Sequence, residues 1–167
     1  GYESYDKSLF GIGYQYSFSD KWSFKSSVFS NFKKGYEPRP FNILDEKINA
    51  AGLRSSLNYK TKLLSLPFEA TIGTELLRER YSFSLFDNLY LSQPGQGSVA
   101  GDEFSKMKQN RNYSNYFLEL NMELLKNFHL EGGLALNTTK YTLEDVFQEN
   151  GNQAEKGYAF GNIWSPR

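Results

Sequence analysis

Hydrophobic and polar residues alternate along most of the chain, and the alternation is first clear in the stretch Gly11–Phe29. A strict period of two is typical of a β-strand with two unlike faces, because successive side chains of a strand point to opposite sides. By itself the pattern leaves open whether the apolar side contacts a protein core, a partner or lipid. The apolar positions of this stretch are Ile12, Tyr14, Tyr16, Phe18, Trp22, Phe24 and Val28.

Seven long strands are predicted from the same period. Each has about 10–12 residues, whereas strands of globular proteins usually have about 5–6. The segment Tyr113–Leu124 also contains good helix formers, so a helix is the alternative there, although the period of two fits it without exception. We therefore expect an all-β fold, an antiparallel up-and-down meander of about seven long strands. The expected strands are Ser8–Phe18, Trp22–Phe32, Asn49–Lys60, Phe68–Leu77, Tyr113–Leu124, Phe128–Tyr141 and a last strand that begins near Gly157 and stops at Trp164–Arg167.

The connections between these strands alternate in length. Short turns at one end and long loops at the other are the layout of an outer-membrane β-barrel. A connection of about 35 residues is also uncommon in a soluble domain. The expected short links are Ser19–Lys21, Thr61–Pro67 and Leu125–Asn127, and the expected long links are Lys33–Ile48, Arg78–Asn112 and Thr142–Lys156.

Charged residues within the strands all lie on the side opposite the apolar residues. A soluble sandwich would also keep charge off its core, so this separation alone does not identify a membrane protein. The strands, however, have about the 9–11 residues that a tilted spanning strand needs. Aromatic residues also gather near the short-turn end, as in an interfacial girdle. The charged positions are Lys25, Arg54, Lys60, Glu69, Glu75, Glu119, Glu123 and Glu131, with His129 beside them, and the aromatic positions are Trp22, Tyr59, Phe68, Phe128 and Trp164.

Composition narrows the class of protein. The 19 basic and 19 acidic residues balance, which gives no electrostatic reason to expect nucleic acid as a partner. No cysteine is present, so disulfides and thiolate metal sites are excluded, and no apolar run approaches the roughly 18 residues of a spanning helix. An odd, open set of strands in lipid would leave unpaired backbone edges. We therefore expect the 167 residues to be a fragment, one arc of a larger transmembrane β-barrel.

Three stretches resemble a known family. The hairpin and loop "YQYSFSDKWSFKSSVFSNFKKGYEPRPFNILDE" (Tyr14–Glu46) and the strand "FEATIGTELLRERYSF" (Phe68–Phe83) resemble TonB-dependent outer-membrane receptors. The end of the chain, "GNIWSPR" (Gly161–Arg167), resembles the periplasmic turn that precedes a late barrel strand. The strand and turn sequences of these stretches are similar to those of Bacteroidetes-type, siderophore-receptor-like members of the family.

The resemblance implies that residues 1–167 are part of the barrel domain of such a receptor, without its plug domain. The complete barrel would have about 22 strands and enclose the plug. The implied location is the bacterial outer membrane. The implied partners are outer-membrane lipid, the remainder of the barrel and the plug, the TonB complex acting through the plug, and a small-molecule ligand such as an iron–siderophore. No cofactor and no enzymatic activity are expected.

Cations and aromatic side chains occur together in the segments expected to be long loops. Such pairs suit an anionic, aromatic ferric chelate, through charge-assisted hydrogen bonds and stacking. The alternative for each residue is a role in loop packing or in the aromatic girdle. The candidate ligand-binding residues are Tyr36, Arg39, Arg78, Arg80, Tyr81, Arg111 and Tyr113.

No catalytic or metal site is expected. His129 has no clustered partner, so it is a poor metal ligand, and the carboxylates that share its side of the strands are better explained as a solvated wall than as acid–base catalysts. Two other functions stay open at this point. One is a porin-like outer-membrane barrel that does not depend on TonB, and the other is a soluble β-sheet module for ligand binding or adhesion.

Overall fold

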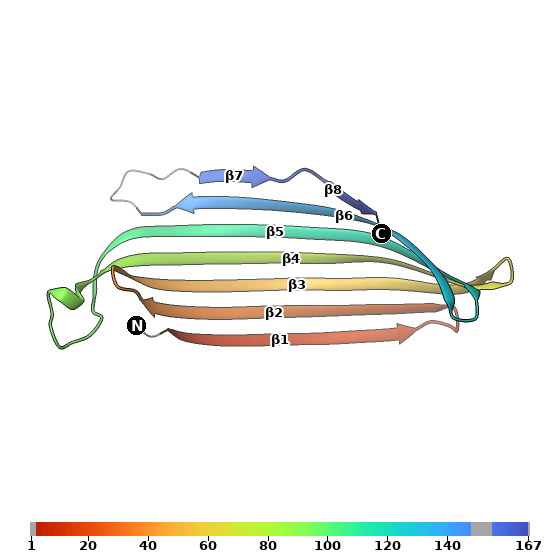
Figure 1. Ribbon diagram of the computed structural model, residues 1–167, viewed down its shortest axis with the longest axis horizontal. Helices are drawn as coiled ribbons and strands as arrows, with labels where there is room; N and C mark the ends of the chain where they lie inside the picture. The colour runs from red at the N-terminus through yellow and green to blue at the C-terminus, as the bar shows by residue number, and fades with distance from the viewer. Residues whose placement is uncertain (1–2, 148–154, 167) are drawn as a thin grey trace.

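The computed structural model describes residues 3–147 and 155–166, which form one antiparallel sheet with its strands in chain order (Figure 1). This confirms the all-β up-and-down meander, and the segment with helix-forming residues is a strand. The sheet is not closed, since β1 and β7 lie at its two edges. The strands are β1 (Ser4–Ser17), β2 (Trp22–Pro38), β3 (Asn42–Leu63), β4 (Leu66–Asn88), β5 (Ala100–Leu125), β6 (Phe128–Asp145), β7 (Glu155–Ala159) and β8 (Ile163–Pro166).

The strands are much longer than the sequence pattern suggested. β3, β4 and β5 have 22, 23 and 26 residues. The expected long loops Lys33–Ile48 and Arg78–Asn112 are therefore wrong, because most of their residues continue the paired strands. What remains at that end is a turn at residues 39–41 and a loop at 89–99 that opens with a short 3-10 turn, η1 (Leu89–Leu91). The expected link Thr142–Lys156 is shortened by β6 and β7, and its residues 148–154 lie outside the described residues.

Short turns join the strands at the opposite end, as predicted. Residues 64–65 connect β3 to β4, and residues 126–127 connect β5 to β6. Leu64 and Ser65 have φ angles of 51° and 69°, as both central residues of a type I′ hairpin turn require. In the second turn only Asn127 is left-handed, with a φ of 71°, and the pairing shifts register between Glu123 and Leu125. In the remaining turn, the Ser19 hydroxyl oxygen accepts hydrogen bonds from the backbone amides of Lys21 and Trp22, each 3.2 Å long.

Register gives the sheet two distinct faces. One row of directly opposed residues crosses six strands on the same face, and every member is apolar. Lys25 stands opposite Gln15 and Ser56, on the other face, as the alternation predicted. We call the face with the apolar row the outer face and the opposite one the inner face. The row consists of Tyr16, Phe24, Leu57, Ile72, Leu118 and Leu134.

Curvature distinguishes the faces as well. Along β4, outer-face Ile72, Leu76 and Arg78 are exposed, whereas inner-face Gly73 and Leu77 are half-buried. Side chains diverge on the convex side of a curved sheet and crowd together on the concave side. The outer face is therefore the convex one. Within the described residues no helix is long and apolar enough to cross a membrane.

Two pairs of polar residues within the apolar part of the outer face bond to each other, whereas the Thr74 hydroxyl is buried there without a partner in the described residues. The hydroxyls of Ser26 and Ser55 are 2.7 Å apart, and those of Ser114 and Thr138 are 2.6 Å apart. Each pair joins neighbouring strands on the outer face. Paired hydroxyls need no water, so these residues are compatible with an apolar surrounding.

The end of the chain differs from the sequence-based expectation. β8 pairs with residues 134–137 of β6, so the predicted periplasmic turn at Gly161–Arg167 is wrong over its described residues, which include a strand. Trp164 stands opposite Leu136, eight residues along β6 from Phe128, and not near the short turns. Trp22 does lie at the short-turn end, where its ring is 4.4 Å from that of Tyr59.

Candidate ligand-facing site

The two faces exchange character toward the long-loop end of the sheet. On β4, the continuous run of apolar outer-face positions stops near Leu76, the next two outer-face residues are Arg78 and Arg80, and the next apolar one is Phe86, opposite Ile43. Beyond that point the inner face carries the apolar and aromatic residues Leu77, Tyr81, Phe83 and Leu85. The long-loop end of the inner face is thus lined by aromatic residues, with charged groups among them.

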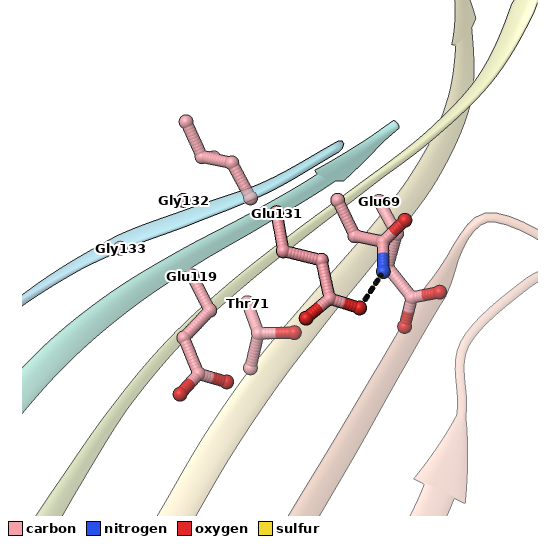
Figure 2. Close-up of a pocket in the computed structure, with 8 residues that line it drawn as sticks. Glu69, Thr71, Glu119, Glu131, Gly132 and Gly133 are labelled. Carbon is pink, nitrogen blue, oxygen red and sulfur yellow. Dashed lines mark hydrogen bonds between the residues drawn. The ribbon is translucent and has the colours of Figure 1, made fainter. Parts of the chain in front are cut away.

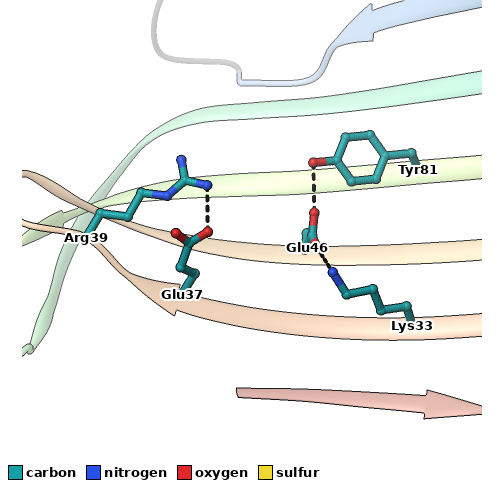
Figure 3. A network of polar contacts seen from close by, with 5 residues as sticks. All are labelled: Lys33, Glu37, Arg39, Glu46 and Tyr81. Atoms are coloured by element: carbon teal, nitrogen blue, oxygen red, sulfur yellow. Dashed lines mark hydrogen bonds and ion pairs between the residues drawn. The ribbon is translucent and has the colours of Figure 1, made fainter. Parts of the chain in front are cut away.

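Glu46 is the centre of a polar network on this part of the inner face (Figure 3). Its carboxylate accepts a 2.7 Å bond from Lys33 Nζ and a 3.0 Å bond from the hydroxyl of Tyr81, so β2, β3 and β4 each contribute one group. The side chains of Lys33 and Glu46 are only 27 % and 15 % exposed. Gly35 stands opposite Glu46, and a Cβ at that glycine would lie 2.9 Å from Glu46 Oε1. Glycine therefore leaves room for the carboxylate.

The network raises the pKa of two of its members, Tyr81 and Lys33. Burial and the hydrogen bond to Glu46 raise the pKa of Tyr81 to about 12. The same carboxylate raises the pKa of Lys33 above its usual value, chiefly through the hydrogen bond. Near neutral pH, Tyr81 is accordingly a neutral hydrogen-bond donor and Lys33 a cation.

We expect Tyr81 to ionise about two pH units later than an ordinary tyrosine. The neutral Tyr81 phenol contributes to the free energy of unfolding in full below pH 10, the usual pKa of tyrosine. This contribution is lost as the pH rises toward 12. The absorbance of tyrosinate near 295 nm, taken as the difference between wild type and Tyr81→Phe, measures this titration. A difference curve with its midpoint near 10 would contradict the network.

Arg111 and Tyr113 lie beside this network on β5. Arg111 Nη2 is 3.3 Å from Glu79 Oε2, and the Tyr113 hydroxyl donates a 3.0 Å bond to Asn137 Oδ1. Arg111 Nε is buried and has no hydrogen-bond partner within the described part of the chain. Arg111 is diagonal to Tyr81, which stands opposite Gln109. This guanidinium, on a side chain that is 33 % exposed, is thus one diagonal position away from an aromatic residue.

The structure brings together three of the seven residues named from sequence: Tyr81, Arg111 and Tyr113 share the inner face of β4 and β5. Arg39 lies in the turn at residues 39–41 and pairs with Glu37 at 2.7 Å (Figure 3). Its hydrogen bond holds the pKa of Glu37 below the usual range.

The other three residues, Tyr36, Arg78 and Arg80, belong to the outer face. Tyr36 is opposite Asp45, and both arginines are exposed. All but Arg39 are strand residues. The expectation of loops is therefore wrong for Tyr36, Arg78, Arg80, Tyr81 and Arg111, whereas Tyr113 was expected at the start of a strand. Sequence reasoning also missed Lys33, Glu46 and Glu79, which only strand register connects to the site.

Ion pairs bridge neighbouring strands along the inner face. Arg54 pairs with Glu75 at 3.0 Å and Lys60 with Glu69 at 3.8 Å, in addition to the pairs of Lys33 and Arg111. Exposed pairs of this kind contribute about 0–1 kcal/mol each. Their main consequence is that charge is compensated at four places along the inner face, although Lys25 and Lys62 there have no ion-pair partner within the described residues.

Carboxylates line a shallow depression nearer the short-turn end of the inner face (Figure 2). Its volume is about 570 Å³, and Glu69, Glu119 and Glu131 contribute to its wall. Glu131 accepts a 2.9 Å bond from Asn121 Nδ2. His129 is on the same face, opposite Glu123. No group of three or more potential metal ligands occurs in the described part of the chain.

No protein-family model matches the chain, and no curated protein matches it in sequence. Solved structures do match its fold. The ferric citrate transporter FecA in its unliganded form superposes with a TM-score of 0.75 at 13 % identity over 96 % of this chain. The alcaligin outer-membrane receptor FauA from Bordetella pertussis gives 0.76 at 12 % over 98 %, and the ferric-catecholate import receptor Fiu from E. coli K12 gives 0.65 at 8 % over 99 %. The chain spans 24–29 % of the length of these receptors.

Proposed function

We propose that this chain forms part of the barrel wall of a TonB-dependent receptor that imports a ferric siderophore or another iron complex across the bacterial outer membrane. The observation that carries the proposal is the six-strand apolar row on the convex face, backed by a polar concave face with ion pairs between its strands. An apolar convex face suits lipid, and a polar concave face suits a wet or plugged lumen. The fold shared with FecA, FauA and Fiu supports the same assignment.

The partners follow from this assignment. The rest of the barrel would pair with the edges at β1 and β7, which satisfies backbone groups that lipid would leave unpaired. A plug would contact the inner face, where the depression of Figure 2 offers carboxylates to its donors. The TonB complex would act through that plug. In this scheme the chain transports and has no catalytic role.

The ligand would bind at the long-loop end of the inner face. Arg111 offers the exposed part of its guanidinium, whose side chain is 33 % exposed, to an anionic chelate, and Tyr81 and Tyr113 offer rings for stacking. The hydrogen bond that the Tyr81 hydroxyl donates to Glu46 fixes the position of the Tyr81 side chain. Arg39, in the turn beyond, would stand at the rim of the entrance.

Uptake of radiolabelled ferric siderophores by iron-starved cells that carry the full-length protein tests the proposal. Arg111→Gln is expected to weaken ligand binding roughly tenfold to a hundredfold, because a hydrogen bond to a charged group is worth about 1.5–3 kcal/mol. Arg54→Gln is the matched control: it too removes an inner-face arginine paired with a glutamate, but one near mid-strand. It should leave binding unchanged.

Two results would contradict the proposal. Uptake that persists after the proton gradient is collapsed would indicate a porin-like barrel, because such a barrel needs no TonB energy. Recovery of the full-length protein in the soluble fraction, as a stable monomer without detergent, would indicate a soluble β-sheet module.

A further inference from the structure

Glu79 and Arg111 form an ion pair within the aromatic part of the inner face. They stand directly opposite each other on β4 and β5, with Glu79 Oε2 3.3 Å from Arg111 Nη2, and both side chains are half-buried. Tyr81 follows Glu79 at the next inner-face position of β4, and Tyr141 stands opposite Arg111 on β6. The carboxylate of Glu79 therefore lies among the residues proposed to hold the ligand.

Glu79 is the residue that compensates the charge of Arg111. No other carboxylate oxygen lies within 4.0 Å of this guanidinium in residues 3–147 and 155–166. On its other side Glu79 faces Ala50, whose short, buried side chain offers no polar group. An anion that approaches Arg111 thus meets an ion pair and not an uncompensated cation. The one anionic oxygen in contact with the guanidinium is attracted, whereas any further negative charge on the ligand is repelled by the carboxylate to a similar extent.

The other cations near the aromatic residues are compensated in the same way. Lys33 Nζ is 2.7 Å from Glu46 Oε1, and in the turn beyond Arg39 Nη2 is 2.7 Å from Glu37 Oε2. These described residues together carry no net charge, so they provide no net positive field for a polyanion. Two further lysines and two aspartates on this part of the inner face also balance in number: Lys7, Asp87, Asp145 and Lys156.

The outer face of β4 shows that such compensation is not general at this level of the sheet. Arg78 and Arg80 precede and follow Glu79 along the strand, and both are exposed. Neither has a carboxylate oxygen within 4.0 Å in the described part of the chain. Strand register thus places acids beside the inner-face cations and leaves these outer-face cations unpaired, which makes compensation a property of the ligand-facing surface.

We propose that Glu79 is a specificity-determining residue, which limits the ligand to iron chelates with at most one negative charge and excludes polyanionic chelates. The inference rests on the proposed function, which puts the iron complex against Arg111 and Tyr81. A chelate with one anionic oxygen gains a charge-assisted hydrogen bond from the exposed part of the guanidinium. A polyanion gains the same bond, but its further charges face the carboxylates of Glu79 and Glu46 in a partly desolvated site.

Ferric chelates of graded charge, bound to the full-length protein in neutral nanodiscs, test the proposal. Three hydroxamate groups neutralise Fe³⁺, replacement of one of them by a catecholate leaves one negative charge, and three catecholates leave three. Wild type is expected to bind the neutral and the singly charged chelate about tenfold more tightly than the trianionic one, because the further charges meet carboxylates. This ranking is measured on wild type, so it does not depend on whether a variant folds.

Glu79→Gln keeps the size of the side chain and removes its charge. The variant is expected to bind the trianionic chelate about tenfold more tightly than wild type does, with the neutral chelate changed less than about twofold. Its affinity for the trianion should also fall as salt is added, because Arg111 is then uncompensated. The matched control is Glu75→Gln, since Glu75 lies on the same face of β4 and pairs with Arg54 at 3.0 Å, closer to mid-strand. The control should bind all three chelates as wild type does.

Three outcomes would overturn the inference and leave the proposed function in place: a wild type that prefers the trianion, an unchanged charge preference in Glu79→Gln, or equal gains in Glu79→Gln and Glu75→Gln. Each of them requires that the protein binds iron chelates. A wild type that binds none of the three chelates would instead reject the proposed function, and the role of Glu79 with it.

Discussion

Replacing Ile72 with arginine is expected to destabilise the membrane-inserted protein by about 2–4 kcal/mol, the cost of a cation at mid-depth on the lipid face of a barrel. Ile72 is 60 % exposed on the outer face, between Leu57 and Leu118 in the apolar row. It has no acidic neighbour there to offset the desolvation of a guanidinium. The free energy of unfolding of the full-length protein in phospholipid vesicles, measured by denaturant titration, gives the effect.

Thr71→Arg is the matched control, because Thr71 is the preceding residue of the same strand and differs only in its face. An arginine there would stand opposite Glu119 and beside Glu69 on the inner face. The Thr71→Arg variant loses the hydrogen bond that Asn58 donates to the threonine hydroxyl, but its guanidinium gains carboxylate neighbours. The loss of stability should therefore stay below about 1 kcal/mol. Equal costs for the two variants would show that the outer face does not contact lipid.

The depth of the new arginine in the membrane provides a second test of whether the outer face contacts lipid. Leu76→Arg places the new cation two residues from Arg78, at the edge of the apolar part, where the cost should fall toward about 0–1 kcal/mol. A cost as large as that of Ile72→Arg would mean that the apolar part extends past Arg78.

The strand ends show what the sequence pattern could and could not predict. The expected strands stopped at Phe32, Leu77 and Tyr113 because charged residues then appear at positions that had been apolar. Backbone pairing does not depend on which face is apolar, so the strands continue with the two faces exchanged. The signal was present in "RERYSFSLF", where Tyr81, Phe83 and Leu85 keep the period of two on the opposite parity.

The candidate site was predictable only in part, for a related reason. Cation–aromatic proximity in sequence selected Tyr81, Arg111 and Tyr113, which share the inner face of β4 and β5. It also selected Arg78 and Arg80, which lie on the outer face because the side of the sheet depends on parity within a strand. Glu46 is 13 residues from Lys33 and 35 from Tyr81. Contacts over such separations can be predicted only when the strand register is known. Because Lys33–Ile48 was assumed to be a loop, no register was assigned to these residues.

Two inner-face glycines are covered by aromatic rings from the neighbouring strand. Gly52 stands opposite Phe29, and Gly73 stands opposite Phe117. A Cβ at Gly73 would lie 2.3 Å from the Phe117 ring and 2.8 Å from the backbone oxygen of Ser55. The ring thus occupies the space that any other residue at position 73 would need.

Gly73→Val is therefore expected to lower the free energy of unfolding by about 1–3 kcal/mol, the usual cost of overpacking. The matched control is Gly132→Val, since a Cβ at Gly132 meets nothing within 4 Å and its outer-face position suits an apolar side chain. Adding Phe117→Leu to Gly73→Val should recover part of the loss, because the smaller side chain vacates the space above position 73. The remainder should persist, since the Ser55 carbonyl stays in place. Strictly additive effects in this double-mutant cycle would show that Phe117 does not cover Gly73 in the membrane.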